Sequence, residues 1–224
     1  MLVTADLDEP VNPTLRLAAR LAEADGGTVR PLVVITPAGE NPTREQLEHA
    51  EQAIGALGLE AHIEVRHDDS ELAGMAHTAR SLGSSLVLVN ATGASWLPAT
   101  NSPSADLLES CTSPVAFVRP DAVTADRVVL LLSKHRAARP GPAARLAVDL
   151  AVRLASSGLE TIVVAGGTVA TELLTPLAGH PVARSDWASW LDGGVRPEDL
   201  VVMPRGRNGA AAYRAARRAE AMGA

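Results

Sequence analysis

Hydrophobic and polar residues follow one another along this chain in a repeating order of short apolar runs and amphipathic segments. Apolar runs of four to eight residues, bounded by Gly, Pro, Asn or Ser, predict strands buried on both faces. Segments with apolar residues three and four apart predict helices with one buried face. In the first half, strands are predicted at Met1–Asp6, Val29–Ile35, Ala61–Arg66, Ser85–Val89 and Pro114–Arg119, and helices at Pro13–Asp25, Asn41–Leu57, Ser70–Leu82 and Asp106–Cys111.

The pattern starts again after a polar connector, Pro120–Asp126. Leu15–Ile35 can be laid over Ala144–Val164, which indicates that a whole half-domain is repeated. In this second copy, strands are predicted at Val128–Leu132, Leu159–Ala165, Pro181–Arg184 and Leu200–Met203, and helices at Pro142–Ser156, Thr171–Leu177, Trp187–Leu191 and from Gly209 onward. Strands alternating with helices predict parallel sheets with right-handed crossovers. The sequence therefore predicts an α/β protein with two tandem doubly wound domains, 1–120 and 126–224. The second domain is truncated, because it lacks a fifth strand.

Composition narrows the class of protein. Aromatic residues make up 2% of the chain, so Val, Leu, Ile and Ala must build the core. Cys111 is the only cysteine, which excludes an internal disulfide and favours a reducing compartment. No apolar run reaches the roughly 18 residues of a membrane span, so we expect a soluble, cytoplasmic protein.

The two halves of the chain carry net charges of opposite sign. Residues 1–120 hold 16 Asp and Glu against 7 Arg, whereas residues 126–224 hold 9 against 13 Lys and Arg. Halves of opposite sign predict either that they face each other or that the second half meets an anion. Nucleic acid is not expected as a partner, because no basic stripe is interleaved with stacking aromatic residues.

The stretch Ser85–Gly93 is the first place to look for a small-molecule site. An apolar run ends there in an Asn/Thr/Gly turn, and open α/β sheets bind ligands beyond the carboxyl ends of their strands. Asp6 ends the first strand, whose carboxyl end should lie beside that of the fourth. Its carboxylate could bond a ribose or simply be solvated.

Several motifs of the first half resemble those of the universal stress protein family. They are the acidic Asp6, the turn Asn90-Ala-Thr-Gly93, the pair Asn101-Ser102 and the closing strand Pro114–Arg119. The resemblance implies a domain that binds ATP or AMP, at Thr4, Ala5, Asp6, Val89, Asn90, Thr92, Gly93, Asn101 and Ser102. Asn90 and Asn101 stand where the family has glycines, so a phosphate has less room and AMP or a cyclic dinucleotide fits better than ATP. Ser102 could equally cap the following helix.

The tandem arrangement resembles the cytosolic C-terminal region of monovalent cation/proton antiporters. It implies a non-enzymatic, stress-response module that senses an adenine nucleotide, with an antiporter as partner and with pairing as a homodimer or an internal pseudo-dimer. The alternative is a dimerisation or docking scaffold that has lost nucleotide binding. A slow ATP hydrolase is disfavoured because no base or metal pair is evident.

A second candidate site lies in the second half, where five potential cations follow its first and fourth strands: Lys134, His135, Arg136, Arg205 and Arg207. Those strands should end side by side, and the loop at Gly206 offers backbone donors as well. These cations could bind a phosphate or the acidic first half, or form a solvated basic rim. A metal site is not expected at His67-Asp68-Asp69, because adjacent loop residues rarely face one ion.

Overall fold

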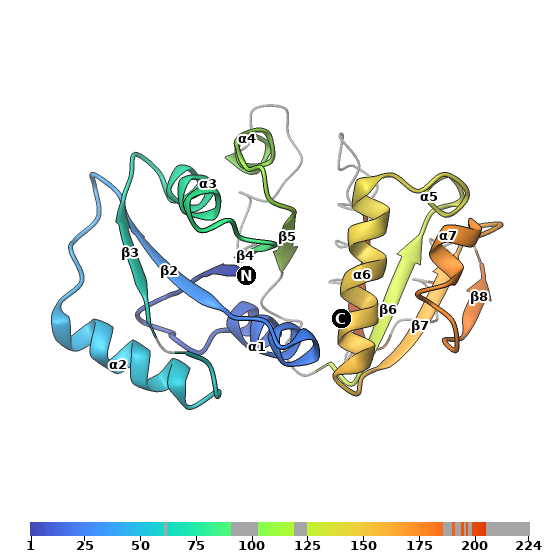
Figure 1. Cartoon of the computed structure of the whole chain (residues 1–224), viewed down its shortest axis with the longest axis horizontal. Helices are drawn as coiled ribbons and strands as arrows, with labels where there is room; N and C mark the ends of the chain where they lie inside the picture. The colour runs from blue at the N-terminus through green and yellow to red at the C-terminus, as the bar shows by residue number, and fades with distance from the viewer. Residues whose placement is uncertain are drawn as a thin grey trace. The chain divides into compact units, whose positions relative to one another are not determined.

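The computed structural model covers the chain and describes residues 1–60, 62–90, 103–118, 125–185, 190, 194, 196 and 199–204. The chain divides into two compact units, Met1–Val123 and Thr124–Ala224, drawn in Figure 1. No helix among the described residues combines the length and hydrophobicity that crossing a bilayer requires.

The first unit is a doubly wound parallel sheet. Its elements are β1 (Leu2–Thr4), α1 (Pro13–Asp25), β2 (Arg30–Ile35), α2 (Arg44–Gly55), β3 (Glu64–His67), α3 (Glu71–Leu82), β4 (Val87–Asn90), α4 (Pro103–Ser110) and β5 (Val115–Val118). The strands pair in parallel in the order β3-β2-β1-β4-β5. Helices α1 and α2 cover one face and α3 and α4 the other, as Figure 1 shows.

Local signals in the sequence set the helix ends. Thr43 caps α2 through a reciprocal pair of bonds, in which the Gln46 amide donates to Thr43 Oγ1 (3.2 Å) and the Thr43 amide donates to Gln46 Oε1 (2.8 Å). Ser70 caps α3, and Gly83 ends it in the left-handed conformation that glycine adopts readily (φ 59°).

Apolar side chains on alternate positions of each strand build the core. Leu2, Val87 and Val89 pack with Met75 and Ala79 of α3, all at most 6% exposed. Val3 and Leu88 are also fully buried, so the central strands are covered on both faces. This core fixes where the carboxyl ends of β1 and β4 lie.

The second unit repeats the arrangement in a smaller form. Its elements are β6 (Arg127–Leu132), α5 (Lys134–Ala138), α6 (Pro142–Ser156), β7 (Glu160–Ala165), α7 (Thr171–Leu174), β8 (Val182–Arg184) and β9 (Asp199–Val202). Within the described residues the strands form a four-stranded parallel sheet in the order β8-β7-β6-β9. The predicted fold class, α/β with two parallel sheets of which the second is smaller, is confirmed. The helix predicted from Gly209 lies outside the described residues, as does most of Trp187–Leu191.

The sequence did not predict the short helix α5. This helix contains Lys134, His135 and Arg136, and it is held by a bond from the Ala137 amide to the Ser133 carbonyl (2.8 Å) and by the fully buried Ala137. A single helical turn has too few residues for an apolar period to show in the sequence. Helix α7 ends at Leu174 rather than at Leu177.

Candidate functional site

The carboxyl ends of β1 and β4 meet at the point where the strand order of the first unit reverses. Leu2 pairs with Val87 and Val3 with Leu88, so both strands end at the same edge of the sheet. We call this edge the β1/β4 rim: Thr4, Ala5, Asp6, Val89 and Asn90, with Glu71 of α3 (below). In open α/β sheets, ligands bind in the crevice at such a switch point. The expectation that the first and fourth strands end side by side is confirmed.

Asp6 is exposed and its backbone is held at the rim. The amide of Ala5 donates to the Leu32 carbonyl of β2 (2.8 Å), which fixes the turn out of β1. The Asp6 side chain accepts at Oδ1 from the amides of Asp8 (2.9 Å) and Glu9 (3.4 Å). These bonds orient the carboxylate through Oδ1, and among the described residues no donor reaches Oδ2.

Asn90, the last residue of β4, has a buried side-chain oxygen that lacks a hydrogen-bond donor in the described part of the chain. Its Oδ1 atom is buried, and no hydrogen-bond donor reaches it among the described residues. A buried acceptor without a partner costs about 1–3 kcal/mol. A donor from a bound molecule would remove that cost. Thr92, Gly93, Asn101 and Ser102, the other predicted residues of this site, lie outside the described residues.

Glu71, in the first turn of α3, is a rim residue that sequence reasoning missed. Desolvation, and then the charge of Asp6, raise the pKa of the Glu71 carboxyl above its ordinary value. Glu71 is exposed at the start of α3, so solvent screens the effect of Asp6. One signal in the sequence could have found Glu71. It directly follows Ser70, which caps α3, and α3 starts at the edge of the sheet where β1 ends.

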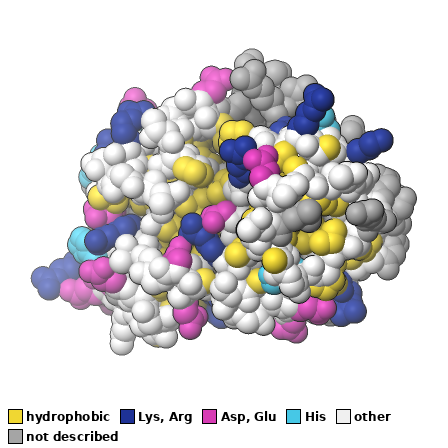
Figure 2. All heavy atoms as spheres, turned by 45° about the vertical axis from the view of Figure 1, so that its right-hand side comes forward, with side chains coloured by type: hydrophobic (Ala, Val, Ile, Leu, Met, Phe, Trp, Pro, Cys, Tyr) yellow, Lys and Arg dark blue, Asp and Glu magenta, His cyan; other side chains and the backbone are white. Residues whose placement is uncertain are grey.

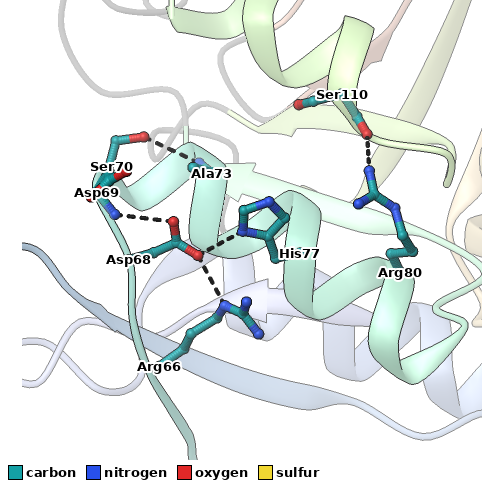
Figure 3. A network of polar contacts seen from close by, with 8 residues as sticks. All are labelled: Arg66, Asp68, Asp69, Ser70, Ala73, His77, Arg80 and Ser110. Atoms are coloured by element: carbon teal, nitrogen blue, oxygen red, sulfur yellow. Dashed lines mark hydrogen bonds and ion pairs between the residues drawn. The ribbon is translucent and has the colours of Figure 1, made fainter.

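A polar network beside the rim joins β3 to α3, as Figure 3 shows. Asp68 accepts from His77 Nδ1 (2.7 Å) and from Arg66 Nε (3.0 Å), and its Oδ1 accepts from the Asp69 amide (3.0 Å). The bonds from His77 and Arg66 lower the pKa of Asp68 to about 2. Asp68 is therefore a carboxylate at neutral pH, committed to protein partners.

The structure also shows what His67 does. Its Nε2 lies 3.0 Å from Asn41 Oδ1, so it does not join Asp68. Nowhere in the described part of the chain do three His, Cys, Asp or Glu side chains come together as metal ligands.

In the second unit, β6 and β9 are neighbours, as β1 and β4 are in the first. Lys134 begins α5 directly beyond β6. The backbone passes close to it at Gly166, where an added Cβ would lie 3.0 Å from the backbone nitrogen of Lys134. His135 is exposed and Arg136 is half-buried. Arg205, Gly206 and Arg207 lie outside the described residues, so a site shared between the two groups stays a prediction. Lys and Arg mix with Asp and Glu over the face drawn in Figure 2.

No protein-family model and no curated protein matches this sequence. Three solved structures of universal stress proteins show similarity. One, in complex with cAMP, is 19% identical, covers 54% of this chain and 97% of its own, and has a TM-score of 0.41. One from Burkholderia pseudomallei is 20% identical, with coverages of 53% and 93% and a TM-score of 0.39. One from Archaeoglobus fulgidus DSM 4304 is 15% identical, with coverages of 92% and 77% and a TM-score of 0.45. These values do not establish a family or a ligand for this chain.

Proposed function

We propose that the first unit binds an adenine nucleotide at the β1/β4 rim and that the chain is a non-enzymatic regulatory module. The observation that carries the proposal is the buried, unpartnered Oδ1 of Asn90 at the switch point of the sheet. Asn90 lies at the carboxyl end of β4, which pairs with β1. Asp6, whose carboxylate is oriented by the Asp8 amide, lies just after β1. Acceptors at a switch point suit the amino and hydroxyl groups of a nucleoside.

Each predicted residue has a role in this proposal. Asp6 accepts from a ribose hydroxyl or an amine, Asn90 accepts through Oδ1, and the backbone at Thr4, Ala5 and Val89 lines the rim. By the resemblance to universal stress proteins, Thr92, Gly93, Asn101 and Ser102 hold the phosphate. Because Asn90 and Asn101 replace glycines there, AMP or a cyclic dinucleotide is favoured over ATP.

The second unit supplies a candidate anion site and the regulatory output. Lys134, His135 and Arg136, together with Arg205, Gly206 and Arg207, would bind a phosphate. Nucleotide would act by shifting a pairing equilibrium between units or between chains, which requires it to prefer one arrangement. The tandem arrangement alone motivates the finer proposal that the partner is a cation/proton antiporter in the cytoplasm.

Thermal unfolding and calorimetric titration of the full chain with AMP, ATP, cyclic di-AMP and cAMP test the proposal. A ligand that binds only the folded state raises the Tm, by an amount that grows with its concentration. We expect AMP or cyclic di-AMP to do so in the wild type and not in Asp6→Ala. No shift with any nucleotide would reject the proposal.

The second candidate function is a docking or dimerisation scaffold that binds no nucleotide. Asn90 and Asn101 favour it, because their side chains fill space that glycines would leave for a phosphate. A chain that ignores every nucleotide but forms a stable dimer would support the scaffold.

A further inference from the structure

Two buried polar atoms lie on the same side of the first sheet, and the described part of the chain supplies a hydrogen-bond partner to neither. One is Asn90 Oδ1 at the end of β4, and the other is the hydroxyl oxygen of Thr14 in the first turn of α1. Helix α1 packs on β1 and β4, the two strands that end at the β1/β4 rim. Its first turn follows the loop that leaves β1, so this turn lies at the carboxyl ends of both strands.

The alternation of side chains along β4 places Asn90 on the face of the sheet that α1 covers. Val89 belongs to the buried cluster that contains Met75 of α3, on the other face from α1 (Figure 1). Successive residues of a strand point to opposite faces, so Asn90 points towards α1. Thr14 is fully buried in the first turn of that helix. Both unpartnered atoms therefore lie between α1 and the carboxyl ends of β1 and β4.

The first turn of α1 leaves Thr14 with a free backbone donor as well. The first amides of a helix have no acceptor within the helix, and Pro13 has no N–H to satisfy. The Leu15 amide donates to Asn12 Oδ1 (2.9 Å), and the Arg16 amide donates to the Asn12 carbonyl (3.1 Å). Among the described residues no acceptor is recorded for the Thr14 amide. The open amide of this turn thus belongs to the residue that carries the unpartnered hydroxyl.

Buried groups of this kind disfavour the folded state unless something bonds them. Thr78 has the same defect elsewhere in the unit: its hydroxyl is unpartnered and its side chain is 6% exposed. Thr78 lies in the second half of α3, away from any helix N-terminus and on the other face of the sheet. At Thr14, by contrast, a hydroxyl, an amide and the Asn90 acceptor lie at one strand end, where open α/β sheets bind ligands.

We propose that Thr14 and Asn90 form a subsite of the β1/β4 rim that binds one ribose hydroxyl of the nucleotide. The inference rests on the proposed function and deepens it. A hydroxyl both donates and accepts: its hydrogen bonds Asn90 Oδ1, and its oxygen accepts from the Thr14 hydroxyl or amide. The positive end of the α1 dipole favours an oxygen acceptor there. An amine would leave the Thr14 donors unused, and a phosphate would meet the Asn90 acceptor, so neither matches the set.

Calorimetric titration of the full chain with AMP, 2′-deoxy-AMP and 3′-deoxy-AMP tests the subsite. The variants are Thr14→Val, which keeps the shape of the side chain and removes its hydroxyl, and Thr78→Val as the matched control. We expect Thr14→Val to weaken AMP binding about tenfold, the effect of one buried hydrogen bond, and Thr78→Val to leave it unchanged. With the deoxy ligand that lacks the bound hydroxyl, the effect of Thr14→Val should disappear.

Thermal unfolding without nucleotide separates this role from a structural one. Each variant removes a hydroxyl that has no partner, so both should unfold at a Tm equal to or above that of the wild type. A Tm lowered in Thr14→Val alone would overturn the inference, because it would show that the hydroxyl bonds a buried water in the free chain.

The titrations can also contradict the inference. An unchanged AMP affinity in Thr14→Val would overturn it while leaving the proposed function intact, and so would an equal loss for all three ligands. A wild type that binds none of the three would overturn it too. If ATP and cyclic di-AMP also failed to bind, the proposed function itself would be rejected.

Discussion

Arg127, the first residue of β6, and Asp199, the first residue of β9, form a buried bidentate ion pair. Arg127 Nε donates to Asp199 Oδ1 (2.6 Å) and Arg127 Nη2 donates to Oδ2 (2.5 Å), with the side chains 8% and 1% exposed. Arg127 also donates to the Gly194 carbonyl (3.1 Å), and its guanidinium lies 6.0 Å from the centre of the Trp190 ring. The pair lies at the opposite end of β6 from Lys134, so we assign it to holding β9 in register.

Asp199→Ala should strongly destabilise the second unit. Removing one partner leaves the buried Arg127 charge uncompensated, which costs about 3–5 kcal/mol in comparable pairs. The Arg196 amide also loses its acceptor, Asp199 Oδ2 (2.7 Å). Chemical denaturation of the full chain, followed by Trp fluorescence, measures the change. The control is Glu172→Ala, which breaks the exposed pair with Arg145 and should cost at most about 1 kcal/mol. An equal loss of unfolding free energy in the two variants would show that the buried pair does not stabilise the second unit more than an exposed pair does.

Gly74→Ala should destabilise the first unit although alanine is the better helix former. An added Cβ at Gly74 would lie 2.6 Å from Val34 Cγ1. The propensity gain is about 1 kcal/mol, and overpacking against Val34 costs about 1–3 kcal/mol, so we expect a net loss of up to about 2 kcal/mol. Because the clash is with Val34, the double variant Val34→Ala/Gly74→Ala should lose less than the sum of its parts, as a double-mutant cycle would measure. Strict additivity would mean that the two residues do not meet.

Local signals made the fold predictable. The caps Thr43, Ser70 and Gly83 lie at helix ends, and the apolar strand runs pair in parallel in a doubly wound order. Alternation of strand and helix also predicted that β1 and β4 would end together. These features depend on neighbours in the sequence or on chain topology, both of which a sequence displays.

The parts that could not be predicted depend on side chains brought together by the fold. Asp199 meets Arg127 across 72 positions of sequence, and neither residue has a local pattern that names its partner. His77 reaches Asp68 because α3 turns back over β3, and the effect of Asp6 on Glu71 was hidden because Asp6 lies in the turn after β1, far from Glu71 in the sequence. Polar pairs of this kind carry no period, unlike an apolar face.

Asp68→Asn should change the acid stability of the first unit. The pKa of Asp68 is lowered to about 2 in the folded chain from an ordinary value of 3.8. A lowered pKa means that the carboxylate stabilises the fold above its ordinary value and loses that contribution as pH falls toward the folded value. The wild type should therefore exceed Asp68→Asn in stability at about pH 6, with the gap closing between about pH 4 and pH 2. Denaturation curves across this range measure the gap. The control is Asp69→Asn, since Asp69 bonds Asp68 through its backbone amide and not through its side chain. A gap that persists at the acid end would show that the Arg66 and His77 bonds do not depend on the Asp68 charge.

Glu71→Gln should shift stability in the opposite direction with pH. The pKa of Glu71 is raised above its ordinary value of 4.5, first by desolvation and then by Asp6, so the folded chain holds the proton more tightly than the unfolded chain. Such a group stabilises the fold below the ordinary pKa and loses that effect as pH rises through the folded value. Glutamine cannot ionise, so Glu71→Gln should gain stability relative to the wild type as pH rises above the ordinary value, with Glu45→Gln, at an exposed acid of α2, as the control. The double variant Asp6→Asn/Glu71→Gln should gain less than the two single variants together, because removing either carboxylate already relieves the repulsion between them. If the single gains simply added, Asp6 and Glu71 would not sense each other, and the acidic pair at the rim would have to be abandoned.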